Sequence, residues 1–554
     1  MVINDKLNMT MNTITKDFRL LLASALAIVS CAKEISEVPT EPDDSTPEYT
    51  TITLTAAHPV MTETGAAAQE NEGTAEISTK TTIDETTGSV RWKVGDRLKL
   101  VCEDGADFTT EALTDADLKD GGKTATFKAT VKDGKALKWA VYPSDIVTSL
   151  SDGKFSVTVP QEQDGNFEHA SIEVGEIGEN NSIALKNVCA LLKFKVADAN
   201  TTAAKVFIGG NGAPLNGKAT ISSEILAASY TVEDVPDYQP NVEVRVKGPG
   251  TYYAAILPAK TTGLSMQIYA ADNTLLAENI SSNVLDAPRK AIKNLGELRS
   301  TPFANKMFVT ENGTGNGSSW ENACSFSELI SNLQTLKLTD HVIIMSEGIA
   351  RSATSLITLA AGTKFKVYGG YPKTSSGTDI TGRDLNKYKT DFAGMKQQKE
   401  GDPVRLFNYT DGTIETIFDG IGFTETYQNV GGDVYTGTCL LVGNAKKAYF
   451  VNCRIDKNEK VGSAVVRVGG TKATATFERC TFSNNTVSGK GLIQVQKGGN
   501  LTVRDCDFTQ GNTVSGEAEK YKPKYRVCYK TGGVFTFEGD NKFAADQYEM
   551  SGNY

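Results

Sequence analysis

An internal repeat is centred on Val465-Val466-Arg467-Val468-Gly469-Gly470 and Thr476-Phe477-Glu478-Arg479-Cys480-Thr481-Phe482. A second copy precedes it at residues 440–455 and a third follows at 493–508, so that the cysteines of successive copies lie 27 and 26 residues apart. Each copy has an apolar run, a glycine turn, a second run that ends near the cysteine, and a polar tract. One such unit cannot cover its own apolar face, whereas stacked units bury it between them. The repeat therefore predicts a right-handed parallel β-helix.

The cysteines of the repeat, Cys453, Cys480 and Cys506, are expected to stack inside this coil. Neighbouring rungs place their Cα atoms about 4.8 Å apart, which is within disulfide range. Three thiols in one column cannot all pair among themselves, and small buried thiols fill such a column well. We therefore expect reduced packing cysteines, with a disulfide as the alternative. Residues 417–421 (IFDGI) are expected to form an earlier rung.

Two segments before the repeat resemble a known family. Residues 307–320 (MFVTENGTGNGSSW) resemble the start of pectin-lyase-like β-helix domains in bacterial surface proteins, and residues 364–372 (KFKVYGGYP) resemble a later rung. The resemblance implies that residues 301–554 form one parallel β-helix domain. It also implies kinship with polysaccharide lyases and hydrolases, which makes an enzyme the main competing hypothesis.

Residues 50–300 have a different pattern, in which short alternating runs are separated by glycine, Asp-Gly and Asn-Gly turns. Examples are residues 51–54 (TITL), 154–159 (KFSVTV) and 190–196 (ALLKFKV). Alternation with period two and frequent turns predicts half-buried strands in β-sandwiches. We expect one sandwich over residues 50–180 and a second over residues 181–300, so the whole chain is predicted to be all-β.

Several phrases in this region resemble the fimbrillins, pilin-like lipoproteins of Gram-negative anaerobes. They are residues 90–96 (VRWKVGD), 139–143 (WAVYP), 187–192 (NVCALL), 214–219 (PLNGKA) and 252–258 (YYAAILP). The resemblance implies two sandwich domains and, for many members, polymerisation by strand exchange between fimbrial subunits. Shaft subunits are processed next to an arginine, but this chain has none between Arg19 and Arg91. A tip, accessory or stand-alone member is therefore the better expectation.

The first 31 residues are typical of a secretory signal. Basic residues precede the apolar run at positions 20–29, which is too short to span a bilayer. Residues 28–31 (IVSC) resemble the lipobox of bacterial lipoproteins, which predicts cleavage before Cys31 and its lipidation; an ordinary signal peptide is the alternative. Residues 32–49 are acidic and rich in proline, serine and threonine, so they predict a flexible tether. The chain is thus expected on the outer membrane, held by its lipid and exposed at the cell surface.

Composition excludes several classes of partner and chemistry. The net charge of −10 and the pI of about 5.2 make nucleic acid an improbable partner. The cysteines lack the paired spacing of a zinc site, and only three histidines are present. We therefore predict no cofactor, no metal and no histidine-based catalytic centre.

Polysaccharide-active β-helix enzymes need carboxylates that converge from neighbouring rungs. Asp505 and Asp507 flank Cys506 and should face outward when the cysteine faces inward. The neighbouring rungs offer arginine, threonine and asparagine at those positions, which gives a mixed polar face. No catalytic residue is therefore predicted among the candidates, which are Asp419, Asp456, Asp505 and Asp507.

The same outward face supplies the residues that we expect to meet a ligand, namely Asp505, Asp507, Arg479, Asn484 and Asn485. For the two asparagines, the ordinary composition of a polar turn is an equal explanation. The resulting hypothesis is a surface lipoprotein, fimbria-associated or stand-alone, that presents its β-helix to a host protein or glycan. The alternatives are a polysaccharide-active enzyme and a glycan-binding partner of an uptake system.

Overall fold

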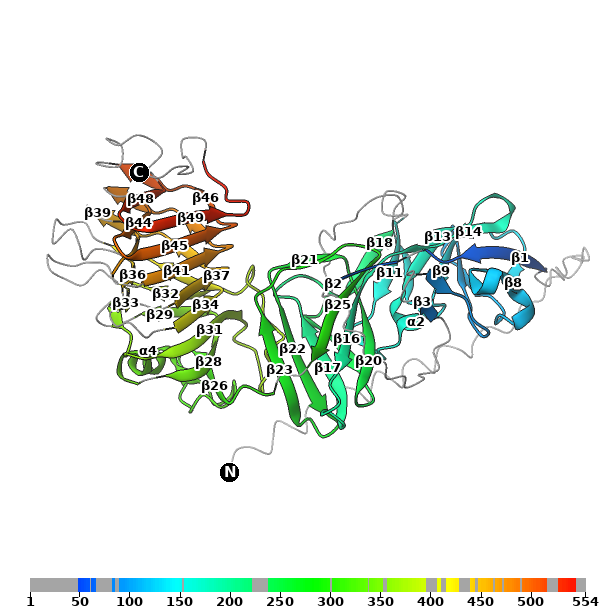
Figure 1. The fold of residues 1–554 in the computed structure, drawn as a ribbon. Helices are drawn as coiled ribbons and strands as arrows, with labels where there is room; N and C mark the ends of the chain where they lie inside the picture. The colour runs from blue at the N-terminus through cyan, green and yellow to red at the C-terminus, as the bar shows by residue number, and fades with distance from the viewer. Residues whose placement is uncertain are drawn as a thin grey trace, which may run out of the picture. The chain divides into compact units, whose positions relative to one another are not determined.

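The computed structural model describes the chain in seventeen segments, separated by short gaps. They are residues 48–59, 61–65, 82–84, 89–151, 154–221, 238–298, 301–336, 338–351, 356–394, 406–409, 415–427, 439–443, 447–461, 464–470, 473–488, 491–515 and 527–544. Tyr49–Tyr554 form one compact unit. The predicted fold class is confirmed: β-sandwich layers are followed by a parallel β-helix (Figure 1).

The N-terminal part contains four sheets that we call layers 1 to 4. Their strand orders are β14-β1-β8-β7, β15-β13-β9-β5-β6, β2-β25-β16-β20 and β12-β19-β17-β22-β23, and the smaller sheets are β10-β11-β18, β3-β4 and β21-β24. The strands are β1 (Tyr49–Ala57), β2 (Thr62–Gly65), β3 (Thr82–Asp84), β4 (Ser89–Arg91), β5 (Lys99–Cys102), β6 (Asp107–Thr109), β7 (Leu118–Lys119), β8 (Thr124–Lys132), β9 (Leu137–Tyr142), β10 (Thr148–Ser151), β11 (Lys154–Val159), β12 (Glu162–Gln163), β13 (Glu173–Glu176), β14 (Ser182–Ala184), β15 (Lys186–Asn187), β16 (Ala190–Val196), β17 (Ala203–Gly209), β18 (Gly217–Ile221), β19 (Asn241–Arg245), β20 (Gly250–Ile256), β21 (Ala259–Thr261), β22 (Leu264–Ala270), β23 (Leu275–Ser281), β24 (Leu285–Ala287) and β25 (Ala291–Leu298), with one short helix, α2 (Phe167–Ala170).

Each pair of neighbouring layers encloses an apolar core. Trp92 and Phe127 lie in the core of layers 1 and 2. Strand β16 of layer 3 supplies two cores at once, because Leu191 packs with layer 2 while Leu192 and Phe194 pack with layer 4. A strand that is covered on both faces needs apolar residues at successive positions, which explains the run ALL at its start.

Three strands cross the boundary expected at residues 180 and 181. Strand β2 pairs with β25, β12 pairs with β19, and β18 pairs with β11. Alternation within a strand identifies its buried face but carries no information about its partner. The two sandwiches therefore share strands and a common core instead of dividing at one point in the sequence.

The C-terminal part is a coil of parallel strands. Coil sheet 1 has the order β27-β26-β28-β31-β34-β37-β41-β45-β49, coil sheet 2 is β29-β32-β35-β38-β42-β46, coil sheet 3 is β30-β33-β36-β40-β44-β48, and coil sheet 4 is β39-β43-β47. The strands are β26 (Asn305–Thr310), β27 (Cys324–Ser325), β28 (Thr339–Ser346), β29 (Gly348–Arg351), β30 (Ile357–Thr358), β31 (Lys364–Tyr371), β32 (Thr390–Ala393), β33 (Phe407–Tyr409), β34 (Glu415–Asp419), β35 (Ile421–Thr424), β36 (Leu440–Val442), β37 (Lys447–Val451), β38 (Arg454–Asp456), β39 (Glu459–Val461), β40 (Val466–Val468), β41 (Ala473–Glu478), β42 (Thr481–Ser483), β43 (Thr486–Ser488), β44 (Ile493–Gln496), β45 (Gly499–Arg504), β46 (Asp507–Gln510), β47 (Thr513–Ser515), β48 (Cys528–Thr531) and β49 (Val534–Glu538).

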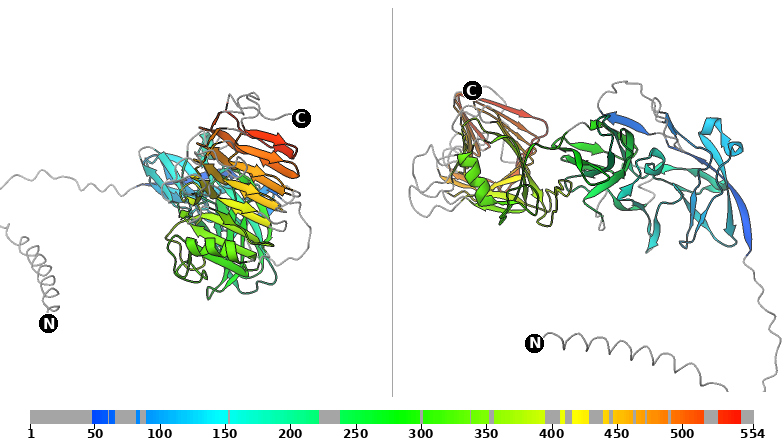
Figure 2. Two further views of the ribbon diagram at one scale, coloured as in Figure 1. Left: turned by 90° about the vertical axis from the view of Figure 1, so that its left-hand side faces the viewer. Right: turned by 90° about the horizontal axis from the view of Figure 1, so that it is seen from below.

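Like side chains stack along the inside of the coil. Phe418, Phe450 and Phe477 form one column of stacked rings. The three repeat cysteines are buried at equivalent corners and are free thiols, as expected. Seen along the coil, the sheets enclose this core and one helix lies across an end (Figure 2).

That helix is α4 (Phe326–Thr335), which covers the first rung. Ser325 caps it by accepting a hydrogen bond from the backbone N–H of Glu328. Leu329 and Leu333 on its apolar face are fully buried in the core of the coil. The helix therefore hides an end that would otherwise expose apolar side chains to water.

Layer 4 packs against coil sheet 1 of the same compact unit. Ile280 of β23 lies in an apolar cluster with Phe308 and Trp320. The buried carboxylate of Glu278 accepts hydrogen bonds of 2.8 Å from Lys306 Nζ, and Gln267 donates to the Thr378 carbonyl at 2.8 Å. Apolar and charged contacts thus join the sandwich to the coil.

Candidate functional site

One residue forms each corner between coil sheets 1 and 2. The backbone of this residue is left-handed in successive rungs, with φ of 71° at Gly420, 52° at Asn452, 51° at Arg479 and 53° at Asp505. A left-handed residue turns the chain sharply, at a cost of about 1 kcal/mol for residues other than glycine. Two of the residues expected to face a ligand, Arg479 and Asp505, therefore lie in the same corner column.

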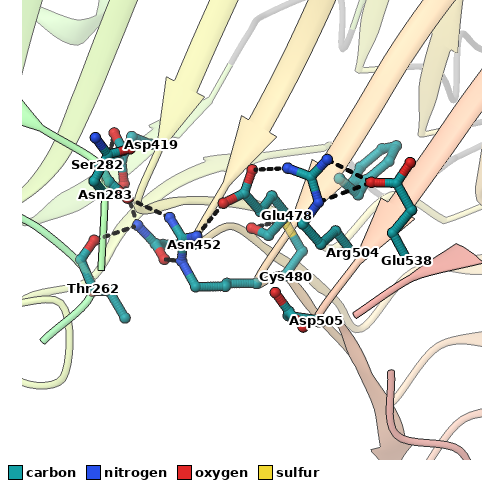
Figure 3. Close-up of polar contacts among 12 residues, drawn as sticks. Thr262, Ser282, Asn283, Asp419, Asn452, Glu478, Cys480, Arg504, Asp505 and Glu538 are labelled. Carbon is teal, nitrogen blue, oxygen red and sulfur yellow. Dashed lines mark hydrogen bonds and ion pairs between the residues drawn. The ribbon is translucent and has the colours of Figure 1, made fainter. Parts of the chain in front are cut away.

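Arg479 points toward the sandwich. It donates hydrogen bonds to the carbonyl of Ser282 and to Asn452 Oδ1, the latter at 3.1 Å, and pairs with Glu478. The column continues through Arg504, which lies between Glu478 and Glu538 (Figure 3). Arg479 thus holds the coil against layer 4, which differs from the ligand-facing role expected from the sequence.

Asp505 and Asp507 lie on the outside of the last rungs. Asp505 is exposed, and its Oδ1 accepts the backbone N–H of Asp540 at 2.7 Å. Asp507 is half-buried and accepts hydrogen bonds of 2.8 and 2.6 Å from the backbone and hydroxyl of Thr509. Partial burial alone would raise the pKa of Asp507, but the hydrogen bonds from Thr509 and Gln510 lower it overall. Both carboxylates are occupied by local turns.

Asn484 and Asn485 are adjacent in sequence but lie on opposite sides of the wall. Asn484 is exposed at the corner that follows coil sheet 2 and donates to Asp456 Oδ1 at 2.9 Å. Asn485 is completely buried. Its amide bonds Asn512 and the carbonyl of Ile455, and its oxygen accepts from Asn458. Asn485 therefore belongs to an interior ladder, which corrects the expectation that it faces outward.

The outer face of coil sheet 2 carries a charged pair across a glycine. Arg454 of β38 pairs with Asp391 of β32, over the position of Gly422 in the strand between them. A Cβ at Gly422 would lie 1.9 Å from the Asp391 carboxylate. Burial raises the pKa of Asp391 although Arg454 acts to lower it. The glycine makes room for a salt bridge that spans three rungs.

A cavity of about 250 Å³ opens beside this pair, at the corner that follows coil sheet 2. Arg351, Gly394, Glu425, Tyr427 and Lys457 line it. Arg351 donates to the Gly394 carbonyl at 3.0 Å and to the Glu425 carboxylate at 2.6 Å. A cavity with a few converging polar groups and an aromatic ring is typical of a ligand site.

A larger cavity of about 360 Å³ lies in the N-terminal part, with Asp164, His169 and Arg245 among its lining residues. The charged groups there pair with one another, His169 with Asp164 and Arg245 with Glu162. It is distant in the chain from the β-helix, and its ionic groups satisfy each other. The cavity on the coil is therefore the stronger candidate site.

The two remaining carboxylates considered for catalysis have structural partners. Asp419 is fully buried and accepts hydrogen bonds of 2.9 Å from both Arg383 and Asn452. Asp456 accepts from Ser483 and Asn484. Within the described residues, no group of three histidine, cysteine or acidic side chains is placed to hold a metal ion.

Sequence reasoning did not find the cavity residues, although a signal for two of them was present. Glu425 and Lys457 occupy the corner at which Asn484 stands in the later rung, with φ of 54° at both. The buried ladder also had a signal, because Asn458, Asn485 and Asn512 recur at intervals of 27 residues, like the cysteines. A polar residue that repeats with the period of the core is more consistent with an interior position than with a binding surface.

The lipidation site predicted at Cys31, the signal over residues 1–31 and most of the tether over residues 32–49 lie outside the described residues. In the part of the chain that the structure describes, no helix has the length and apolarity required to cross a membrane.

Comparison with known proteins places the repeat region in a family. Residues 407–546 match the model of the right handed beta helix region. No curated protein matches the chain. Solved structures with similarity to it include a fimbrial assembly protein from Parabacteroides distasonis, at 11% identity over 45% of this chain and 92% of that one, with a TM-score of 0.23. Another is the tip fimbrial protein Mfa3 from Porphyromonas gingivalis, at 8% identity over 42% of this chain and 81% of that one, with a TM-score of 0.18. The segment 407–546 is thus a right-handed β-helix region by family model as well as by fold.

Proposed function

We propose that this chain is a lipid-anchored surface protein of the adhesin type, which presents its β-helix to a glycan or a host protein and does not alter it chemically. The observation that carries the proposal is the contrast on the coil. The carboxylates suited to catalysis are held in structural contacts, whereas a cavity with mixed charges and an aromatic ring is open on the outer face.

The proposal includes a fimbria-associated role as tip or accessory subunit, with a stand-alone adhesin as the alternative. A vacant sheet edge exposes N–H and C=O groups that a strand of another subunit can satisfy. The lack of arginine between Arg19 and Arg91 supports a role other than that of a processed shaft subunit. The name of Mfa3, a tip fimbrial protein, agrees with this direction.

Binding and turnover are separated by one experiment on the purified full chain. The protein is incubated with cultured host cells, matrix proteins and a polysaccharide panel, and both saturable binding and newly formed reducing ends or unsaturated products are measured. We expect saturable binding without product. Product release would establish the enzyme alternative, and an absence of binding to every target would refute the adhesive function.

Anchoring and exposure are tested on intact cells. Labelling with a fatty-acid analogue should mark the wild-type chain and not a Cys31→Ala variant, and protease added outside should degrade the coil. A Cys31→Ala chain that is still labelled, or a coil protected from protease, would contradict this part of the proposal.

A further inference from the structure

The cavity on the coil is built across four consecutive rungs. Arg351 ends β29, Gly394 follows β32, Glu425 and Tyr427 follow β35, and Lys457 follows β38. These strands are direct neighbours in coil sheet 2. Three rung spacings of about 4.8 Å make the site about 14 Å long. A ligand that fills it must be elongated along the axis of the coil.

The charged groups of the cavity form an alternation of donor and acceptor. Arg351 uses two of its nitrogen atoms for Gly394 and Glu425, and a guanidinium carries five N–H donors. Its side chain is 47% exposed and that of Glu425 42%. Adjacent hydroxyl groups each donate and accept one hydrogen bond, so they match a neighbouring arginine and carboxylate.

Tyr427 and Lys457 complete the cavity. The backbone of Tyr427 is fixed by a parallel bridge to Glu459, and its half-buried ring supplies an apolar surface on which the C–H face of a sugar ring can lie. Lys457 Nζ is 3.8 Å from Asp456 Oδ2, beyond hydrogen-bonding distance, and its side chain is 64% exposed. The lysine therefore retains donors for a ligand oxygen.

Glu425 and Lys457 remain at this corner although its backbone disfavours them. Both have φ of 54°, a conformation that asparagine and glycine adopt more readily and that Asn484 and Gly511 occupy in later rungs. The two charged residues thus stand only where the corner borders the cavity. Strain that coincides with a cavity is the pattern expected of a functional site.

We propose that this cavity binds a linear glycan with vicinal hydroxyl groups, about three sugar units long, through Arg351 and Glu425, with Tyr427 beneath a sugar ring and Lys457 at one end. This inference rests on the proposed function and specifies its ligand class. Binding by the coil without turnover needs only these side chains and no metal.

The test uses the purified full chain and an array of defined oligosaccharides of one to six units, each spotted untreated and after periodate oxidation, which cleaves vicinal diols. We expect binding that increases up to about three units and then levels, and that is lost after oxidation. Tyr427→Ala and Glu425→Gln should each weaken binding by about tenfold or more, as truncation of a central contact does.

Matched controls lie on another face of the coil. Tyr449→Ala removes a half-buried tyrosine and Lys447→Ala an exposed lysine, both from β37, and their binding should stay within about twofold of the wild type. Because Glu425→Gln keeps the size of the side chain, it reports on the site even if Tyr427→Ala fails to fold.

Each outcome has a definite meaning. Sugar binding that the cavity variants leave unchanged would overturn the site while the adhesive function stands. Binding only to acidic peptides or matrix proteins would overturn the ligand class. A chain that binds no target of any kind would overturn the proposed function together with this inference.

Discussion

The buried asparagines show most directly how single residues hold the coil together. Asn458, Asn485 and Asn512 follow one another along the axis, and each donates to a main-chain carbonyl as well as to its neighbour or its own turn. A buried polar group is tolerated only when its hydrogen bonds are satisfied. The ladder meets this condition by satisfying side chain and backbone together.

Replacement of Asn485 by alanine should therefore be costly. Asn485→Ala leaves the Ile455 carbonyl and the Asn458 amide without partners, and we expect the free energy of unfolding to fall by about 3 kcal/mol. Urea denaturation measures it. Asn484→Gly is the control, since that neighbour is exposed and left-handed, and it should change stability by less than about 1 kcal/mol. Equal losses in the two variants would refute the interior role of Asn485.

Lys457 offers a test in the opposite direction. Asparagine tolerates φ of 54° better than lysine, and the Asp456 pair that is lost is loose. Lys457→Asn should therefore raise the free energy of unfolding by about 0.5 to 1 kcal/mol while it weakens glycan binding. Lys447→Asn, in a strand, should bring no such gain. A destabilised Lys457→Asn chain would show that the lysine contributes to folding instead.

The residue scale also shows where sequence reasoning stops. The inward cysteines and phenylalanines were predictable, because alternation holds within each strand. Asn485 was placed wrongly because the left-handed Asn484 resets the alternation at the corner. Arg479 was misjudged for another reason: its partner Ser282 lies 197 positions away in the chain, and no local pattern reports such a distance.

Among the elements, the short helix α2 (Phe167–Ala170) carries a titratable pair. His169 Nδ1 lies 2.5 Å from Asp164 Oδ2 and its Nε2 3.4 Å from Glu168 Oε1. The hydrogen bond with Asp164 raises the pKa of His169 above 6.5, against partial burial, and Glu168 and Asp145 act in the same direction. The protonated histidine is therefore favoured in the folded chain.

A raised pKa in the folded state stabilises the fold only while the histidine is protonated. The contribution should be complete below about pH 6.5 and should disappear as the pH rises through the folded pKa. The difference in unfolding free energy between wild type and His169→Gln should thus shrink with rising pH, and it should be small, because the ring is 47% exposed. His341→Gln, in the coil, serves as the comparison. A difference that grows with pH would contradict the assignment.

Repeat strands and sandwich strands differed in how far the sequence predicted them. Strands β37, β41 and β45 were identified with their register, since equal spacing of the cysteines aligns one rung with the next. The partners of β2, β12 and β18 were not predictable, because hydrogen bonding between strands depends on tertiary contacts that alternation does not encode. Repetition supplies the pairing that a single strand lacks.

At the scale of the whole molecule, the contact between sandwich and coil is tight. A Cβ at Gly209, the last residue of β17, would lie 2.0 Å from the carbonyl oxygen of Thr381. Arg383 and Asp419 form a fully buried pair close by, which Ser282 joins through its hydroxyl. The two parts should therefore move as one body.

Gly209→Ala tests this contact. The added methyl group must displace the backbone of Thr381, and we expect a loss of about 2 kcal/mol or more, with faster hydrogen exchange confined to β22 and residues 376–384. Gly178→Ala is matched to it, because its nearest neighbour is 3.5 Å away, and it should have little effect. Exchange rates unchanged at the contact would show that the parts are only loosely joined.

The crossing of strands between the two sandwiches has a consequence for the time course of folding. Strand β2 leaves the ribosome early, yet its partner β25 is among the last strands made before the coil. Pairing between such remote segments is slow, because much loop entropy must be lost first. A nascent chain that has completed only its first third would still carry unmatched edges, and a cell that makes this protein must protect them until synthesis has passed residue 298.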